Sequence, residues 1–329
     1  MNIQNLGKGA IKSPEDKRDF LYEGLMSVGQ LKPFDWSKGF DVTKKIGTLK
    51  VENQNGSSSC TGQAWSKYQE ILNALENVNA DLSAKDIYSR IFQPQGGAYI
   101  RDGAKLLISR GVVTEKTNPS YENGQPPSEE FMRKILEGNE EEATINGSSS
   151  YATTTHNDIE WIAQMIRDNN GVVTGFFGDN EGWANADIKP PKSRSWGHCI
   201  LLTGACMRNG EKAIKFINSW GEEWGENGFG YFYGDSLGEM FDIWTLVDKI
   251  NIPKQKTMQL KIYQDDIYLI NENAKFGWSI PDPDILIAIK KHFELLRQPL
   301  SEPVEFNPVG YYIVHGSNAQ DIRSFFNIH

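Results

Sequence analysis

The sequence has few cysteines, no long apolar run and no excess of positive charge. None of its apolar segments approaches the roughly 18 consecutive residues of a membrane-spanning helix, so we expect no association with a membrane. The formal net charge is −9, and Lys and Arg form no long cluster. Binding to a nucleic-acid backbone needs clustered positive charge to displace counterions, so we expect no nucleic-acid partner.

The N-terminus and the cysteines indicate in which cellular compartment we expect the protein. The first 20 residues lack the apolar core of a secretory signal peptide. The cysteines are Cys60, Cys199 and Cys206, and the last two lie in or beside one apolar segment. A disulfide framework is therefore not expected, which favours a reducing compartment. We expect a cytoplasmic protein, and these absences fit a bacterial or phage-encoded product.

The residues that are present predict a globular chain. It is 39% hydrophobic and 23% charged over 329 residues, enough to bury a core in one large or two modest domains. Apolar residues recur at helical spacing after Cys60, and further helical patterns cover 104–109 and 157–168. The second half instead carries short apolar runs typical of strands, CILLTGACM and AIKFIN. Helices first and strands later predict an α+β fold of two lobes.

Three segments are expected around this core. Residues 1–32 are polar and irregular, and they predict an extension lying on the surface. Residues 138–155 are rich in Gly, Ser, Thr and Glu, which predicts an exposed loop or a connection between lobes. The main domain is expected to span 33–252. Residues 253–329 then predict a small αβ module that carries no catalytic constellation.

The position of Cys60 suggests catalysis. A thiol attacks as a thiolate, and a helix N-terminus lowers its pKa. His198 lies at the mouth of an apolar strand, where it would be held rigidly, and Asn218 comes at the end of a strand pattern. Each has an ordinary alternative: a small buried cysteine, a silent core histidine, and a turn-forming asparagine. Residue types alone leave this choice open.

Three segments together resemble the papain family of cysteine peptidases. INSWGEEWGENGFGYF is similar to the family's Asn-Ser-Trp-Gly signature, and WGHCILLTG to the segment around its catalytic histidine. VENQNGSSSC is similar to the segment that ends at the nucleophile, with Gln54 six residues before Cys60. The resemblance covers roughly residues 33–250. It implies a papain-like fold with a helical lobe and an antiparallel β-barrel-like lobe.

The resemblance also implies a role for each matching residue. Cys60 is the expected nucleophile, His198 the base and acid, and Asn218 the residue that orients the imidazole. Gln54 is expected to donate to the oxyanion that forms during attack. Trp220 is expected to cover the His–Asn hydrogen bond and to keep water away from it.

Other positions concern substrate binding and departures from the family. Gly96 and Gly97 resemble the glycine pair that lets a substrate backbone approach closely. The pocket beside Gly97 and Cys199 is expected to select a substrate side chain. Ser57 stands where relatives usually have a disulfide-bonded cysteine, and Thr61 where they have an aromatic residue. The extension is too short for the long helical prodomain of many relatives, so zymogen control is not expected.

These features predict a cysteine peptidase that cuts peptide or protein substrates through an acyl-thioenzyme on Cys60, without a metal or other cofactor. Two alternatives remain open. One is a catalytically idle papain-like scaffold for assembly or partner binding, and the other a Cys-His-Asn amidase acting on peptidoglycan, or a transferase. An intact set of Cys60, His198, Asn218 and Gln54 favours the peptidase. The C-terminal module is a candidate site for a protein partner.

Overall fold

The computed structural model describes most of the first 247 residues and short stretches after them. The described residues are 3–16, 19, 21–22, 33–47, 49–247, 258–264, 266–271, 276–280, 283–284, 286–287, 289–290, 304–305 and 312–314. The chain divides into two compact units, 1–248 and 249–329. The boundary predicted between 252 and 253 lies outside the described residues. No helix in the described part is both long and apolar enough to cross a membrane.

The first unit contains a group of helices and an antiparallel sheet, in the order that the sequence predicts. Its elements are η1 (Ile3–Asn5), β1 (Ala10–Ile11), β2 (Phe40–Asp41), η2 (Val42–Lys44), α2 (Cys60–Leu75), α3 (Ala84–Ile91), β3 (Ala98–Tyr99), α4 (Ile100–Ser109), α5 (Glu129–Arg133), α6 (Glu140–Ile145), β4 (Ser150–Thr154), α7 (Ile159–Asn169), β5 (Val172–Gly178), β6 (Trp196–Arg208), β7 (Glu211–Ile217), β8 (Phe229–Phe232), η3 (Ser236–Glu239) and β9 (Met240–Val247).

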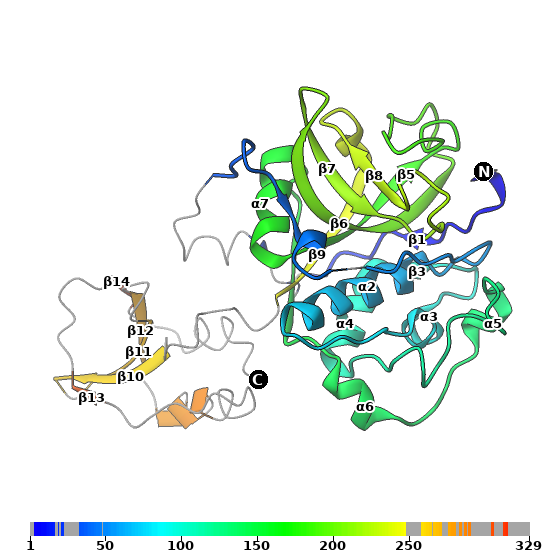
Figure 1. The fold of residues 1–329 in the computed structure, drawn as a ribbon. Coiled ribbons are helices and arrows are strands. Elements are labelled where there is room, and N and C mark those ends of the chain that lie inside the picture. Colours follow the sequence, from blue (N-terminus) through cyan, green and yellow to red (C-terminus); the bar gives the residue numbers. More distant parts are fainter. Residues whose placement is uncertain are drawn as a thin grey trace. The chain divides into compact units, whose positions relative to one another are not determined.

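The sheet carries strands from both ends of this unit. Its order is β4-β9-β5-β6-β7-β8, with β2 paired to β6, and all of these pairings are antiparallel. Figure 1 shows this curved sheet above the helices α2 to α6, with α7 beside it. Strands β4 and β8 are the two edges of the path, so the expected barrel-like lobe is an open sheet.

Helix α2 lies between the helical part and the sheet. The apolar residues that predicted this helix are buried along it, and so are polar residues such as Gln63 and Lys67. An α-helix with neighbours on several sides buries more than one stripe. The N-cap residue Ser59 makes no side-chain capping bond. Instead, the Ser57 hydroxyl donates to the Gln54 carbonyl at 2.7 Å.

The segment 138–155 was predicted to be an exposed loop or a connection between lobes, and it leads from the helical part into the sheet. It forms helix α6 and strand β4, and β4 pairs with β9 along its whole length. The sequence of strand β4 is SYATT, and all of its residues except Ala152 carry a hydroxyl group. It therefore shows no alternation of apolar and charged residues. Ala152 and Thr154 are its buried positions. Thr favours strands because of its β-branching, and this signal is weaker than an apolar run.

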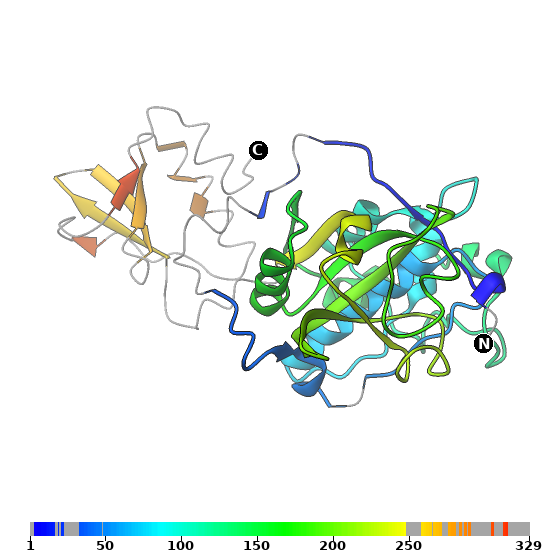
Figure 2. The same cartoon turned by 90° about the horizontal axis from the view of Figure 1, so that it is seen from above.

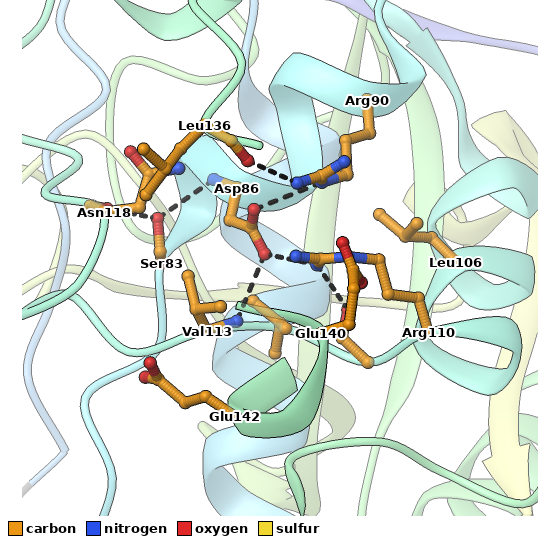
Figure 3. A network of polar contacts seen from close by, with 12 residues as sticks. Ser83, Asp86, Arg90, Leu106, Arg110, Val113, Asn118, Leu136, Glu140 and Glu142 are labelled. Atoms are coloured by element: carbon orange, nitrogen blue, oxygen red, sulfur yellow. Dashed lines mark hydrogen bonds and ion pairs between the residues drawn. The ribbon is translucent and has the colours of Figure 1, made fainter. Parts of the chain in front are cut away.

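Asp86 on α3 organises the helical part (Figure 3). Its carboxylate accepts from Arg110 at 2.7 Å, from Arg90 at 3.2 Å and from the Val113 N–H at 3.1 Å. Only 1% of this side chain is exposed, so all three donors replace lost water. The network fixes α3 against α4 and the segment that follows it.

Replacing Asp86 by alanine is expected to lower the free energy of unfolding by about 3–5 kcal/mol, because Arg110 and Arg90 would lose the buried carboxylate that they share and the Val113 N–H would lose its acceptor. Urea unfolding followed by tryptophan fluorescence measures this loss. Lys134→Ala is the control, since it breaks an exposed pair with Glu130 and is expected to cost less than about 1 kcal/mol. Equal, small losses in both variants would contradict the role given to Asp86.

The second unit contains a five-stranded mixed sheet. Its order is β13-β10-β11-β12-β14. Its strands are β10 (Met258–Tyr263), β11 (Asp266–Asn271), β12 (Phe276–Ile280), β13 (Val304–Glu305) and β14 (Tyr312–Val314). The helical part of the predicted module falls largely outside the described residues.

Candidate active site

The three predicted catalytic residues come from three elements of the first unit. Cys60 is the first residue of α2 and is fully buried. His198 lies in β6 opposite Phe176 of β5, and Asn218 directly follows β7. The backbone of Cys199, the residue after His198, is hydrogen-bonded to the Cys60 thiol. This contact joins the start of α2 to the strand that carries the histidine.

The orientation of the His198 ring is fixed by Asn218. His198 Nε2 and Asn218 Oδ1 are 2.8 Å apart, and the Ser219 N–H donates to the same Oδ1, also at 2.8 Å. Because an amide oxygen only accepts, Nε2 carries the proton and Nδ1 is the basic nitrogen. His198 Nδ1 is buried and has no hydrogen-bond partner among the described residues. It is therefore available as a proton acceptor.

Trp220 covers this pair as predicted from the resemblance. Its ring stacks on His198 with centroids 4.5 Å apart and an interplanar angle of 24°. The Trp183 ring centroid lies 5.6 Å from that of His198, in a T-shaped arrangement, and 5.7 Å from that of Trp220, with the rings tilted by 57°. The four residues His198, Asn218, Trp220 and Trp183 are almost wholly buried. A hydrogen bond in such surroundings is strengthened by the low local dielectric constant.

Gln54 lies on the other side of the nucleophile. Its Oε1 accepts from the Ser219 hydroxyl at 2.5 Å, and its Nε2 donates to the Ser57 carbonyl at 2.7 Å. The side-chain amide therefore has a defined orientation, with the nitrogen on the side of Ser57. Ser57 takes the place of a disulfide cysteine, and its hydroxyl and carbonyl bond back to Gln54. These bonds hold Ser57 to Gln54 within the segment before Cys60, without a covalent link.

Residues 7–11, here called the covering segment, lie over Cys60. β1 pairs in parallel with β3, with Ala10 opposite Ala98. The Gly7 N–H donates to the Asn55 carbonyl at 2.5 Å, and the Ala98 N–H donates to the Gly9 carbonyl at 2.9 Å. Figures 1 and 2 show this segment crossing the first unit between the helices and the sheet. Of its five residues only Gly7 is buried and the other four are partly exposed, so the segment lies against the first unit without being enclosed by it.

Glycine allows this close approach. A Cβ atom at Gly7 would lie 1.7 Å from the Ser57 carbonyl oxygen, and one at Gly9 would lie 2.2 Å from the Ser58 carbonyl oxygen. A Cβ at Gly97, on the opposite wall, would lie 2.2 Å from the Gly9 oxygen. Real Cβ atoms do not come so close, so only a backbone without side chains fits here.

The chain beyond the covering segment is anchored on α4. The Arg101 N–H donates to the Ser13 hydroxyl at 3.1 Å, and the Arg101 guanidinium donates to the Pro14 carbonyl at 2.8 Å. The same guanidinium forms an ion pair with Asp19 at 3.0 Å. The Ser13 N–H donates to the Asp242 carboxylate. These contacts tether the segment close to Cys60.

A family model described as "Papain family cysteine protease" matches residues 32–240. The chain belongs to this family. An uncharacterized peptidase C1-like protein of Acanthamoeba polyphaga mimivirus is 26% identical over 261 residues, which are 67% of this chain and 79% of the relative. The α+β papain-like fold and the hydrolase class predicted from the sequence are thereby confirmed.

Solved structures of papain-like proteases share the fold. Xylellain, a cysteine protease from Xylella fastidiosa, has a TM-score of 0.61 and 23% identity, over 74% of this chain and 96% of xylellain. Procathepsin L2 from Tenebrio molitor has the same TM-score at 16% identity, over 74% of this chain and 79% of the procathepsin. Membership of this protease family implies peptide or protein substrates.

The electrostatics of this papain-family site reflect its burial. Burial raises the pKa of the Cys60 thiol to about 11, against backbone hydrogen bonds from Cys199, Gly9 and Thr61 that lower it. Burial also lowers the pKa of His198 to about 3, although the bond with Asn218 raises it. The pair is therefore neutral at pH 7 in the covered site. Exposure to water would favour the charged forms of both groups.

The remaining predicted positions lie around the same site. Gly96 and Gly97 both have positive φ, 94° and 75°, and Gly97 faces the covering segment. Cys199 is buried, and the Thr61 hydroxyl is also buried, without a hydrogen-bond partner among the described residues. No group of three or more His, Cys, Asp or Glu side chains in the described part is arranged to hold a metal ion.

Sequence reasoning missed the covering segment and the residues that orient Gln54. The spacing of Gly7 and Gly9 is a weak signal for the segment, because glycines also occur in ordinary loops. Ser219 and Trp183 gave no separate signal, although Ser219 belongs to the recognised Asn-Ser-Trp-Gly segment. Tyr121 is another missed residue, and its contacts appear only when the fold brings it to the segment before Gln54.

Proposed function

We propose that this protein hydrolyses peptide bonds through an acyl-thioenzyme on Cys60, and that it is latent while the covering segment is seated. The observation that carries the proposal is the tautomer of His198. Asn218 holds the proton on Nε2, and Nδ1 is left as a buried base without another partner. A base in this state can take the thiol proton only when it is next to the nucleophile.

In the proposed reaction, His198 Nδ1 accepts the proton of Cys60, and the thiolate attacks the substrate carbonyl carbon. Gln54 Nε2 and the Cys60 backbone N–H donate to the oxyanion of the tetrahedral intermediate. The C–N bond then breaks, and His198 passes its proton to the leaving amine. His198 next accepts a proton from water, which attacks the thioester and releases the acid.

The covering segment blocks this sequence without being a substrate. The backbone N–H of Gly9 lies near the Cys60 thiol and lowers its pKa. The Gly7 and Gly9 carbonyls are bonded to Trp220 Nε1 and to the Ala98 N–H. No carbonyl of these two glycines is presented to Cys60 with its oxygen free to become an oxyanion. The segment therefore occupies the substrate position in a form that resists cleavage.

The test is alkylation of the full-length Gly9→Val chain with a peptidyl epoxide, because a valine side chain cannot fit against Ser58. Mass mapping at about pH 7 locates the label, and a fluorogenic peptide reports turnover. We expect Cys60 to react at least about 10-fold faster than Cys206, the partly exposed cysteine of β6, because a thiolate paired with an imidazolium is the reactive form.

The alternatives predict different results. An idle scaffold would label Cys60 no faster than Cys206 and would not cut the peptide. An amidase acting on peptidoglycan would label Cys60 rapidly but would release product only from cross-linked muropeptides. Either result would overturn the peptidase proposal for this chain.

A further inference from the structure

A two-stranded contact joins Gln54 to the residues that cover the histidine. We call residues 52–54 together with 219–221 the clip. The Gln54 N–H donates to the Ser219 carbonyl at 2.9 Å, and the Gly221 N–H donates to the Glu52 carbonyl at 2.9 Å. Between these bonds, Asn53 forms an antiparallel bridge with Trp220. A displacement of residues 52–54 would therefore move both Gln54 and Trp220.

The Glu52 side chain fixes one end of the clip. Its carboxylate accepts from the Tyr121 hydroxyl at 2.6 Å and forms ion pairs with Lys50 at 3.1 Å and Lys67 at 3.4 Å. Only 9% of the Glu52 side chain and 4% of the Lys67 side chain are exposed. Burial opposes ionisation, but Lys67, Tyr121 and Lys50 keep the pKa of Glu52 below its usual value. The anchor is a charged group with three partners.

Tyr121 holds two consecutive residues of the clip. Its oxygen donates to Glu52 and accepts from the Asn53 N–H at 2.7 Å. Tyr121 lies in the segment between α4 and α5, and therefore belongs to the helical part of the molecule. One hydroxyl thus sets the position of the backbone immediately before Gln54.

Lys67, the ion-pair partner of Glu52, lies on the same helix as the nucleophile Cys60. It lies seven residues after Cys60 on α2, which is two helical turns, so both side chains project from the same face of the helix. Lys67, Glu52, Asn218 and Ser219 also line one small cavity behind the site. Helix α2 therefore carries the thiol at its start and the ionic anchor of the clip two turns later.

We propose that Tyr121, Glu52 and Lys67 are positioning residues that hold the Gln54 amide in register with the Cys60 thiol. This inference rests on the proposed peptidase function, since it concerns the same oxyanion. None of the three touches the substrate. They act on the reaction through Gln54, because their bonds end on the two residues before it.

The experiment is a double-mutant cycle of Tyr121→Phe and Gln54→Ala in the full-length Gly9→Val chain, with kcat and KM measured on a fluorogenic peptide. Losing an oxyanion donor costs about 10²–10³ in kcat, which sets the ceiling. We expect Tyr121→Phe to lower kcat roughly 5–30-fold with little change in KM. In the Gln54→Ala background we expect less than about a twofold further loss, because the same interaction is already gone.

A second readout separates positioning from a general loss of structure. A peptide aldehyde forms a tetrahedral adduct whose oxygen uses the oxyanion donors, whereas epoxide alkylation of the thiol does not form that oxyanion. Tyr121→Phe is expected to weaken aldehyde inhibition by a factor similar to its loss in kcat and to leave the alkylation rate within about twofold. Glu52→Gln keeps an acceptor for Tyr121 but removes the charge. It is also expected to lower kcat and to weaken aldehyde inhibition.

Tyr68→Phe is the matched control. Tyr68 is buried and, like Tyr121, bonds through its hydroxyl, to the Asn169 carbonyl and to Thr245, each at 2.7 Å. Its bonds lead away from the clip, so kcat is expected to stay within about twofold. Independent, multiplying losses from Tyr121→Phe and Gln54→Ala would overturn the inference, as would equal losses for Tyr121→Phe and Tyr68→Phe. Absence of turnover in the Gly9→Val chain itself would instead count against the proposed function.

Discussion

The Gly9→Val chain is expected to hydrolyse a fluorogenic peptide roughly 100-fold faster than the unmodified chain. Seating of the covering segment gives three hydrogen bonds, those of the Gly7 N–H, the Gly7 carbonyl and the Gly9 carbonyl. At about 1 kcal/mol each, and about 1.4 kcal/mol for each factor of ten, they hold all but about 1% of the molecules closed. A valine at position 9 would collide with Ser58 and remove all three.

The Gly9→Val substitution is also expected to shift the pH dependence of Cys60 alkylation. Burial raises the pKa of Cys60 and lowers that of His198 in the covered site. Opening the site reverses both shifts, so the thiolate is expected to be present at lower pH in Gly9→Val than in the unmodified chain. Iodoacetamide alkylation across pH measures the midpoint for each chain. Gly234→Val is the control, since a Cβ at that position meets nothing within 4 Å. Equal activity in all three chains would show that the segment does not limit access.

Replacing Cys60 by alanine in the Gly9→Val chain is expected to lower kcat by at least about 10⁴. Without the thiol, no acyl intermediate forms, and the remaining donors can only assist direct attack by water. Hydrolysis of the fluorogenic peptide measures this loss. Cys206→Ala is the control within the same sequence and is expected to keep more than half of the activity.

A folding defect must be excluded before that loss is assigned to chemistry. The Cys60 side chain is small and fully buried, and alanine removes only its sulfur atom. The unfolding transition of Cys60→Ala is therefore expected to lie within about 2 kcal/mol of the parent chain. Residual activity above 1% of the parent, with an intact fold, would mean that another group attacks the substrate.

The site residues that could be predicted from sequence are those that lie in short contiguous patterns. Asn218 and Trp220 belong to one segment and His198 to another, and each segment carries enough fixed residues to be recognised alone. Strands β6 and β7 were predicted from their apolar patterns, and their pairing places these two segments side by side. The start of a helix near Cys60 could be predicted from the spacing of apolar residues, and its role as nucleophile only from the resemblance of the segment that ends at it.

What could not be predicted depends on contacts between distant segments. Tyr121 reaches Glu52 across 69 positions of the chain, and Trp220 bonds to Gly7 across 213. Neither contact produces a periodic pattern in the sequence, because the first needs only one hydroxyl group and the second only one glycine at the right position. The polar composition of the extension suggested solvent exposure, yet its contacts combine backbone groups of Gly7 and Gly9 with the side chains of Ser13 and Asp19. The partner role predicted for residues 253–329 stays a prediction.

The tether at Arg101 and Asp242 has a consequence for the competition between the chain and its substrates. A segment attached so close to the site behaves as a competitor at an effective local concentration of about millimolar, whatever the dilution of the protein. Weakly bound peptides would then be turned over slowly, while long substrates that bind on both sides of Cys60 could displace it. A partner that captures residues 3–6 would draw the segment away from Cys60 and act as an activator.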